Sequence, residues 1–327
     1  MDLTSEAKRL QRLADPAPGR VLYVLSALEI ADAIGAGTRS TAELAAGVGA
    51  DRDSLARVLR AAVELDVLAE PEPDVWELRP GGRLLRSDVE GNLRAELADN
   101  DLFGAWTEFL HSVRTGEPCY PKVFGAPLFD RLNERPRERR GFHLHMHARA
   151  QLVYRPLILS RRWPSSGVLV DVGGGTGGLL EQLLATRPEL RGVLFDLPDV
   201  LELSPLSPGD RIEFAAGDVF ADAVPGGDVH VLASVLHDWR DAQAEEILAA
   251  CRSACGSDGE LLVVDRVLPA SGPRPQVFND LLMLAVVGGR ERTAEEWEIL
   301  AERTGFRLGG IDTAADTELA ILRFQPV

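Results

Sequence analysis

The stretch from Val168 to Gly178, VLVDVGGGTGG, decides the fold predicted for this chain. A short apolar run ends in Asp171, a cluster of glycines follows, and an amphipathic segment, LLEQLLATRPEL, comes next. This order predicts a buried strand, a tight turn and a helix. Glycines let the turn lie against a ligand where a β-carbon would clash, and the helix N-terminus attracts negative charge. The stretch therefore predicts a site for a nucleotide-like cofactor, contacted by Asp171, Gly173 and Gly175.

Two further acidic residues end predicted strands after the glycines. Asp196 ends GVLFDL, at about the spacing from the glycine loop where an acidic side chain meets a ribose. Asp218, in AAGDVF, is suited to bind the amino group of an adenine, with Phe220 against the ring. The alternative for Asp218 is an Asx-turn that simply follows a strand. The neighbouring residues predicted to contact the same cofactor are Leu197, Gly217 and Val219.

The glycine pattern alone leaves the cofactor open. Gly173, Gly175 and Gly178 also satisfy the G-x-G-x-x-G fingerprint of dinucleotide sites. A carboxylate directly before the glycines would repel a pyrophosphate but suits an amino acid that carries a sulfonium. Asp171 therefore favours S-adenosylmethionine over NAD.

Five motifs, in order and spacing, give the chain a resemblance to a known family: DVGGGTG, FDLPDV, GDVF, VLHDW and GGRERTAEEW. Over essentially its whole length it resembles the small-molecule O-methyltransferases typified by plant caffeate and isoflavone enzymes, which have a bacterial natural-product branch. The resemblance implies an α/β fold, with a Rossmann-like class I methyltransferase domain and an N-terminal, mostly α, winged-helix-like dimerisation domain. It also implies S-adenosylmethionine as cofactor, an aromatic small-molecule acceptor and a homodimer.

The resemblance assigns the catalytic residues. An aromatic hydroxyl has an ordinary pKa near ~10, so a base assists its methylation at neutral pH, and histidine is the usual one. His237 follows a predicted strand at the carboxyl edge of the sheet and matches the family's base. Asp265 and Glu291 match the acids that orient it. The alternatives are a structural histidine, a strand-end turn and a surface charge.

Other positions follow from the same resemblance. Ala233, four residues before the predicted base, replaces a basic residue of many relatives, and Ser234 is expected to contact the cofactor instead. Side chains near the base and on two helical segments are expected to contact the acceptor. These residues are Phe142, Met146, Asp238, Met283 and Val287. For the two on the first segment, Phe142 and Met146, helix core is the alternative.

The N-terminal part has its own pattern. Residues 18–88 predict three helices and a hairpin, including a capping box at Ser40 and Glu43, a helix stop at Gly49 and a helix over Asp51 to Val67. This is a winged-helix pattern, which raises a DNA-binding regulator as an alternative. Nucleic-acid binding requires a basic face, whereas 35 Lys and Arg stand against 51 Asp and Glu, a net charge of −16. We therefore expect no nucleic-acid partner.

We expect three parts: a dimerisation domain over 1–90, a helical linker and acceptor-pocket region over 91–160, and the methyltransferase domain over 161–327. Predicted strands of the last part cover 167–172, 192–197, 211–215, 228–233 and 260–265, with a terminal pair of strands, one antiparallel. No apolar run is long enough to span a membrane, and the N-terminus lacks the apolar core of a signal peptide. Three cysteines cannot all pair, which fits a reducing cytoplasm.

The sequence leaves alternatives for metal binding and for the reaction. The pairs His143/His147 and Cys251/Cys255 have i, i+4 spacing but no further ligands at suitable spacing, so we expect no metal. A family member that retains the cofactor for hydroxylation or decarboxylation is a rival function. Methylation of nitrogen or of a carboxylate also remains open, because a base is less needed there.

Overall fold

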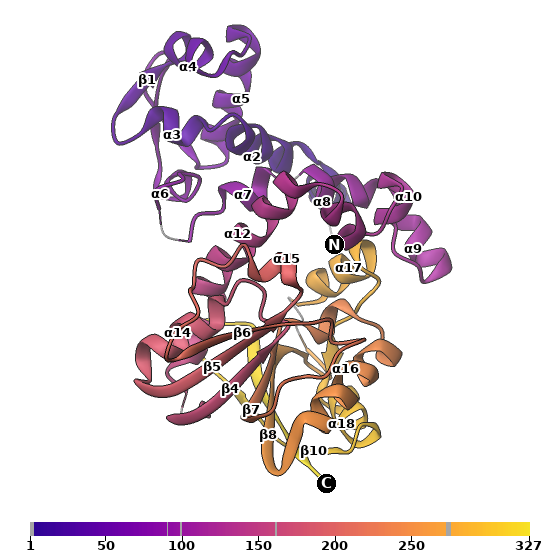
Figure 1. The fold of residues 1–327 in the computed structure, drawn as a ribbon. Helices are drawn as coiled ribbons and strands as arrows, with labels where there is room; N and C mark the ends of the chain where they lie inside the picture. The colour runs from indigo at the N-terminus through magenta and orange to yellow at the C-terminus, as the bar shows by residue number, and fades with distance from the viewer. Residues whose placement is uncertain (1–2, 90, 99, 161, 273–275) are drawn as a thin grey trace. The chain divides into compact units, whose positions relative to one another are not determined.

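The computed structural model describes residues 3–89, 91–98, 100–160, 162–272 and 276–327. The chain forms two compact units, Met1–Asp101 and Leu102–Val327, each with its own apolar core (Figure 1). The boundary after Asp101 falls within the predicted helical region 91–160, so this region contributes residues to both units. That residues 91–160 form a separate linker and acceptor-pocket region stays a prediction. Among the described residues, no helix is both long and apolar enough to cross a membrane.

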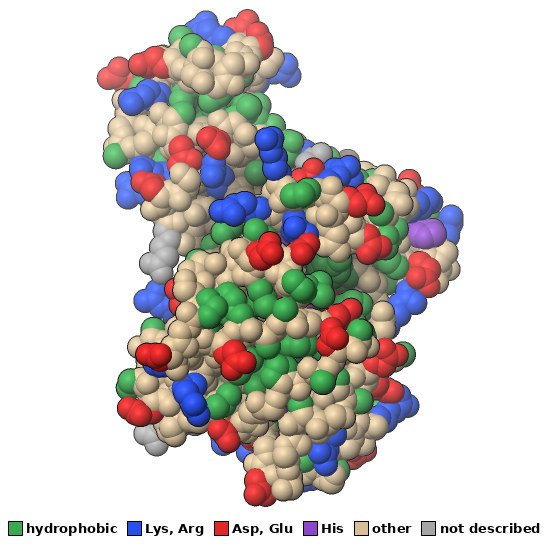
Figure 2. Space-filling model, in the orientation of Figure 1, with side chains coloured by type: hydrophobic (Ala, Val, Ile, Leu, Met, Phe, Trp, Pro, Cys, Tyr) green, Lys and Arg blue, Asp and Glu red, His purple; other side chains and the backbone are tan. Residues whose placement is uncertain are grey.

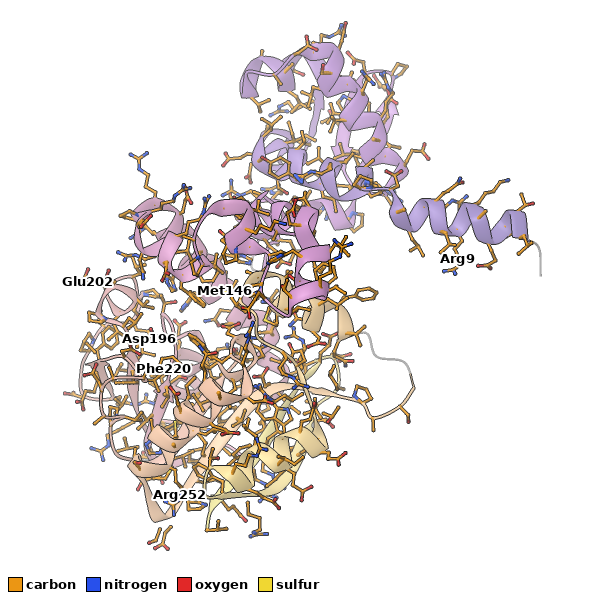
Figure 3. The ribbon with its side chains drawn as sticks, turned by 90° about the vertical axis from the view of Figure 1, so that its right-hand side faces the viewer. Arg9, Met146, Asp196, Glu202, Phe220 and Arg252 are labelled. Atoms are coloured by element: carbon orange, nitrogen blue, oxygen red, sulfur yellow. The ribbon has the colours of Figure 1, made fainter. Side chains whose placement is uncertain are left out.

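The first unit consists of helices around a small antiparallel sheet of order β1-β3-β2. Its strands are β1 (Thr38–Ser40), β2 (Leu68–Glu72) and β3 (Val75–Leu78). Its helices are α1 (Leu3–Ala14), α2 (Ala17–Ala27), α3 (Ile30–Ile34), α4 (Thr41–Val48), α5 (Arg52–Glu64), α6 (Pro80–Arg83) and α7 (Arg94–Ala98). α1 has no buried residue. This helix, on which Figure 3 labels Arg9, extends away from the other helices of the first unit.

Local signals set the helix ends of the first unit. The Ser40 side chain accepts a hydrogen bond from the Glu43 amide and the Glu43 side chain accepts one from the Ser40 amide, which confirms the predicted capping box. Gly49 ends α4 in the left-handed region, as expected. α5 ends at Glu64 rather than at the predicted Val67, because Asp66 has a φ of 56° and turns the chain toward β2.

The charges of the first unit bear on the DNA-binding alternative. On the face shown in Figure 2, its Lys and Arg side chains are interspersed with Asp and Glu rather than gathered into a basic patch. Arg52 and Arg79 form ion pairs with Asp74 and Asp66. A face of mixed charge on an acidic chain gives little electrostatic attraction to nucleic acid.

The second unit is built on one large sheet of order β10-β11-β8-β7-β4-β5-β6, with β9 added beside β8. Its strands are β4 (Ser166–Val172), β5 (Glu189–Asp196), β6 (Ile212–Ala216), β7 (Gly227–Ala233), β8 (Cys255–Leu268), β9 (Arg292–Thr293), β10 (Phe306–Thr313) and β11 (Leu319–Pro326). The pairs from β8 to β6 are parallel, and β11 runs antiparallel to β8 and to β10. The predicted strands and the antiparallel terminal strand are confirmed. β8 begins earlier than expected, at Cys255.

Helices cover both faces of this sheet. Leu169 of β4 packs in a core with side chains of α13 and α14, and its neighbour Val170 packs in another with side chains of α16 and α18. The helices after α7, of which only some cover the sheet, are α8 (Asn100–Ala105), η1 (Trp106–Glu108), α9 (Phe109–Thr115), α10 (Tyr120–Phe124), α11 (Leu128–Asn133), α12 (Pro136–Val153), α13 (Arg155–Ile158), α14 (Gly178–Thr186), α15 (Pro198–Leu201), η2 (Leu236–Asp238), α16 (Asp241–Ala254), α17 (Val277–Val286) and α18 (Ala294–Arg303).

Parallel strands bring the predicted site residues to one edge of the sheet. β8, β7, β4 and β5 are neighbours in this order and run in the same direction. Their carboxyl ends therefore meet, which is where ligands bind in open α/β sheets. Asp171 and Asp196 lie in the last two positions of β4 and β5, and Ser234 directly follows β7. Asp265 of β8 lies beside them, because the preceding Val264 pairs with Ala233, the last residue of β7.

Candidate active site

His237 lies on the short 3-10 helix η2, just past the end of β7. Ser234 leaves the strand with a φ of 52°, in the left-handed region, while its amide donates to the Val264 carbonyl, 2.8 Å away. The turn that follows buries the imidazole, which is 7% exposed. The end of a central strand thus places one histidine, nearly buried, at the ligand-binding edge of the sheet.

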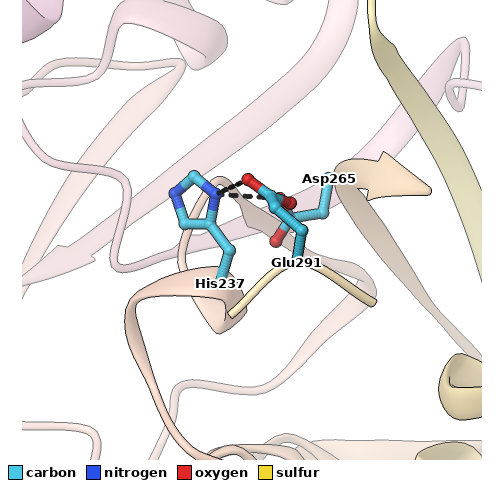
Figure 4. A group of neighbouring side chains, drawn as sticks. All are labelled: His237, Asp265 and Glu291. Atoms are coloured by element: carbon cyan, nitrogen blue, oxygen red, sulfur yellow. Dashed lines mark hydrogen bonds and ion pairs between the residues drawn. The ribbon is translucent and has the colours of Figure 1, made fainter. Parts of the chain in front are cut away.

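Two buried carboxylates contact the same nitrogen of this imidazole (Figure 4). Nδ1 of His237 lies 3.1 Å from Oε1 of Glu291 and 3.2 Å from Oδ1 of Asp265. Asp265 comes from β8 and Glu291 from the loop before β9. The shorter Asp265 side chain therefore does reach the histidine. Nε2 remains on the other side, with Oδ1 of Asp238 3.6 Å away.

The carboxylates determine how the histidine holds its proton. Burial lowers the pKa of His237, but Asp265, Asp238 and Glu291 together outweigh burial and raise this pKa to about 9. Burial raises the pKa of Asp265 to about 6. Burial also favours the neutral form of Glu291, yet the hydrogen bond and charge of His237 hold its pKa below the ordinary value. The group can therefore take up a proton on Nε2 and stabilise the resulting imidazolium.

Three residues around Glu291 were not predicted from the sequence. Asn279 Nδ2 donates to Glu291 Oε1 at 2.5 Å, and Arg266 Nη1 lies 3.4 Å from the same oxygen. The Glu291 amide donates to Asp280 Oδ1 at 2.8 Å. Asn279 lies one helical turn before Met283 on α17, which places both side chains on the same face of the helix. The sequence could have indicated Asn279 as a site residue through this spacing from the predicted Met283. For Arg266, the sequence offered no signal except its position directly after Asp265.

The glycine loop has the features that the sequence predicted. Gly173 and Gly175 both have φ values in the left-handed region, 65° and 60°. Asp196 orders the loop, since its Oδ2 accepts from the Gly175 amide at 2.7 Å and its Oδ1 from the Leu197 amide at 2.7 Å. Burial raises the pKa of Asp196 to about 6.

Asp171 carries a buried carboxylate beside this loop. The residue is 1% exposed, and within the described part of the chain neither carboxylate oxygen has a hydrogen-bond partner. Burial, with Asp196 adding to it, raises the pKa of Asp171 to about 7. A β-carbon on Gly174 would come within 2.6 Å of this carboxylate. A buried acid without donors, next to an open loop of glycines, fits a ligand that carries positive charge.

The third predicted cofactor segment follows β6. Oδ1 of Asp218 accepts from the Phe220 amide at 2.9 Å, so the Asx-turn alternative is present, and a role in adenine binding stays a prediction. Gly217 is buried, and a β-carbon there would meet the Phe195 ring at 2.6 Å. Phe220, labelled in Figure 3, is 39% exposed. Its ring lies edge-on to that of Trp239, with the two ring centroids 4.8 Å apart. Val219 packs, half-buried, against the core on the same side of the sheet.

Ser234 has a partner that the sequence did not reveal. Tyr154, at the end of α12, donates its hydroxyl to the Ser234 Oγ at 3.0 Å. Tyr154 is buried, and burial raises the pKa of its hydroxyl. This contact fixes Ser234 at the predicted cofactor edge, where Ala233 offers no polar group.

The predicted acceptor residues lie on two helices and beside the base. Phe142 and Met146 are half-buried on α12, and Figure 3 labels Met146. Met283 is half-buried on α17, and Val287 is half-buried directly after it. Asp238 adjoins His237. Contact of these five with an acceptor stays a prediction.

Members of the two i, i+4 pairs, His143/His147 and Cys251/Cys255, contact other side chains. His147 contacts Thr176 and Glu181, and Cys255 Sγ lies 3.2 Å from His230 Nδ1. Across the described ranges, neither pair joins a group of three candidate metal ligands.

Comparison with known protein families decides the identity. Residues 106–307 match an O-methyltransferase domain, and residues 18–88 match an O-methyltransferase dimerisation domain. The chain belongs to the O-methyltransferase family. Within that family it is 35% identical to the phenazine O-methyltransferase PhzM of Lysobacter antibioticus, over 94% of this chain and 92% of that protein.

Two other relatives show the range of this methyltransferase family. The 8-amino-8-demethylriboflavin N,N-dimethyltransferase of Streptomyces davaonensis is 36% identical, over 90% of this chain and 88% of that protein. The crystal structure of NcsB1, an O-methyltransferase from neocarzinostatin biosynthesis in complex with S-adenosylmethionine and 2-hydroxy-5-methyl naphthoic acid, aligns with a TM-score of 0.85. It is 32% identical over 97% of this chain and 98% of that one. The family, the fold class and S-adenosylmethionine as cofactor are thereby confirmed for this methyltransferase.

Proposed function

We propose that this methyltransferase moves the methyl group of S-adenosylmethionine to an aromatic hydroxyl of a small natural-product intermediate, with His237 as the general base. The observation that carries the proposal is the pair of carboxylates on Nδ1, which leaves Nε2 to accept the proton. A general base must lie within hydrogen-bond reach of the proton that it removes. In this proposal Asp265 and Glu291 orient the ring and stabilise the imidazolium.

The residues around the glycine loop support a cofactor site at this loop. When bound, S-adenosylmethionine supplies the methyl group, and the chain positions the two reactants. The donor-free carboxylate of Asp171 would face the positive charge, and Asp196 would meet the ribose. The residues proposed to hold the cofactor are Asp171, Gly173, Gly175, Asp196, Leu197, Gly217, Asp218, Val219, Phe220 and Ser234.

The acceptor would lie between the predicted apolar side chains and the base. Phe142, Met146, Met283 and Val287 would contact an aromatic ring, and Asp238 lies beside Nε2 of His237. The relative that binds a hydroxynaphthoic acid supports an aromatic acceptor. Relatives also include an N,N-dimethyltransferase, so N-methylation is the second candidate.

The match to a dimerisation domain supports a homodimer formed through residues 18–88. The three cysteines are buried free thiols, which suits a reducing cytoplasm.

The deciding experiment measures transfer of labelled methyl to phenols, naphthols and anthraquinones, with the matching aromatic amines beside them. His237→Ala should lose at least about 100-fold in kcat on hydroxyl acceptors, while its affinity for S-adenosylmethionine stays within about two-fold. His111→Ala, which alters a histidine of α9, serves as the control. Undiminished turnover by His237→Ala would remove the histidine as base. Product masses without an added methyl would favour the hydroxylation or decarboxylation rival.

A further inference from the structure

The segment Gly288–Arg292 contacts both the backbone and the imidazole of the turn that carries His237. The Arg290 amide donates to the His237 carbonyl at 2.9 Å. A β-carbon on Gly289 would lie 2.1 Å from that carbonyl oxygen, so only glycine permits this approach. Glu291 holds Nδ1 from the same segment. One short loop therefore already orients the ring and its peptide together.

Arg292 completes these contacts from inside the protein. Its side chain is buried and its guanidinium donates to the carbonyls on both sides of His237, from Nη1 to Leu236 O and from Nη2 to Trp239 O, each at 2.9 Å. Nε and Nη2 also donate to Oδ1 of Asp241, at 3.0 and 2.9 Å. The guanidinium lies over the Trp297 ring, 5.2 Å from its centre.

The turn needs such support because its own hydrogen bonds are long. Within it, the Asp238 amide donates to Val235 O at 3.2 Å and the Trp239 amide to Leu236 O at 3.3 Å. A single turn of 3-10 helix has poor hydrogen-bond geometry and is readily deformed. A planar guanidinium with a fixed set of donors restricts both carbonyls at once, whereas a lysine ammonium is a point charge on a flexible stem.

We propose that Arg292 is a positioning residue, which sets the direction of the His237 imidazole by holding the two carbonyls that flank it. This inference rests on the proposed role of His237 as base. Arg292 itself acts through the peptide backbone of η2 and through Asp241. A displacement of about 1 Å at a reacting group can lower the rate about 100-fold. The arginine is thus expected to affect kcat more than binding.

The chain offers a matched control in Arg211. Its guanidinium also donates to backbone carbonyls, those of Leu184, Arg187 and Leu190. Arg211 directly precedes β6, at the amino edge of the parallel sheet and therefore opposite the edge that carries His237. Arg292→Lys and Arg211→Lys remove the same kind of interaction at the two edges.

The test compares Arg292→Lys and Arg211→Lys in the full-length protein. Both should lower the melting temperature, but only Arg292→Lys should lower kcat, by about 10- to 100-fold, with acceptor KM and S-adenosylmethionine Kd within about two-fold. Nitrogen NMR of the histidine side chains, without ligands, supplies a second readout. The His237 signals, assigned by their loss in His237→Gln, should shift in Arg292→Lys and stay in place in Arg211→Lys.

The outcomes separate this inference from the function that it rests on. Unchanged kcat and unchanged His237 signals in Arg292→Lys, or equal losses of kcat in both lysine variants, would overturn the positioning role. Full turnover by His237→Ala would instead contradict the proposed base. If Arg292→Lys does not fold, Asp241→Asn weakens the same anchor. It should shift the His237 signals and lower kcat, and the absence of both effects counts against the role.

Discussion

His237 differs from an ordinary histidine because three carboxylates surround a buried ring. With a pKa of about 9, the imidazole of the ligand-free enzyme is protonated on both nitrogens at neutral pH and carries a positive charge. The neutral form, which is the one proposed to accept a proton from the acceptor, becomes more abundant as the pH rises. Among the charges of the three carboxylates, that of Asp265 raises this pKa most.

We expect kcat/KM for a hydroxyl acceptor to rise between pH 7 and about 9. Asp265→Asn removes a negative charge from the histidine, so its pKa should fall and the rising part of the pH–rate profile should move to lower pH. The measurement is the profile of both proteins, with Asp258→Asn on the surface as the control. An identical profile for Asp265→Asn would contradict the assigned origin of the raised pKa.

The same protonation should contribute to the stability of the fold. Because the folded-state pKa of about 9 exceeds the ordinary value of 6.5, this contribution is complete below pH 6.5 and is lost as the pH rises through 9. His237→Gln should therefore be less stable than the parent at pH 6, and the difference in free energy of unfolding should shrink toward pH 9. Chemical denaturation at several pH values measures it. A difference that grows with pH would contradict the sign.

Asp171 should release a proton when the cofactor binds. Its pKa of about 7 in the free protein reflects burial without donors, and a nearby positive charge would lower it. Calorimetry near pH 7 in buffers of different ionisation enthalpy should show proton release on binding S-adenosylmethionine. Asp171→Asn should bind more weakly and remove the proton release attributable to this group. Equal proton release in both proteins would assign it to another residue.

At the scale of elements, the same motif, a capping box, begins one helix in the N-terminal part of the chain and one in the C-terminal part. Ser40 with Glu43 begins α4, and Thr293 with Glu296 begins α18 directly after the segment that holds His237. The capping box of Ser40 and Glu43 lies in the unit with the dimerisation match, whereas the turn that carries His237 lies in the other unit. A substitution at Ser40 therefore tests the stability of α4 apart from the proposed active site.

Ser40→Ala should destabilise the first unit by about 1 kcal/mol, because an amide at the start of α4 loses its partner. Kinetic constants of the folded enzyme should change little. Denaturant unfolding of the full chain, followed by far-UV circular dichroism, measures the effect. Ser5→Ala in the exposed helix α1 is the control and should leave the midpoint unchanged, whereas equal shifts in both variants would argue against the cap.

At the scale of the whole molecule, the dimerisation match predicts a homodimer. Light scattering coupled to size-exclusion chromatography should give twice the 35.5 kDa of one chain across a range of concentrations. Addition of S-adenosylmethionine should leave that mass unchanged if residues 18–88 form the contact. A monomer mass at every concentration would exclude the proposed assembly.

The sequence by itself determined the local features of this protein. Glycines with Asp171 predicted the strand–turn–helix, Ser40 and Glu43 predicted a helix start, and the five motifs predicted the family. These signals depend on neighbouring residues, whose backbone preferences act over a few positions. The end of α5 was placed too late, because the left-handed Asp66 has no comparable signature.

Only the tertiary structure decided how distant side chains combine. It brings Asp265 and Glu291 to one nitrogen of His237, and it joins Asn279 and Arg266 to Glu291 and Arg292 to the turn around the histidine. These contacts arise because parallel strands gather their carboxyl ends at one edge, which sequence spacing does not express. Burial then changes the pKa of each acid and of the histidine, since the cost of charge depends on which groups share the same dry space.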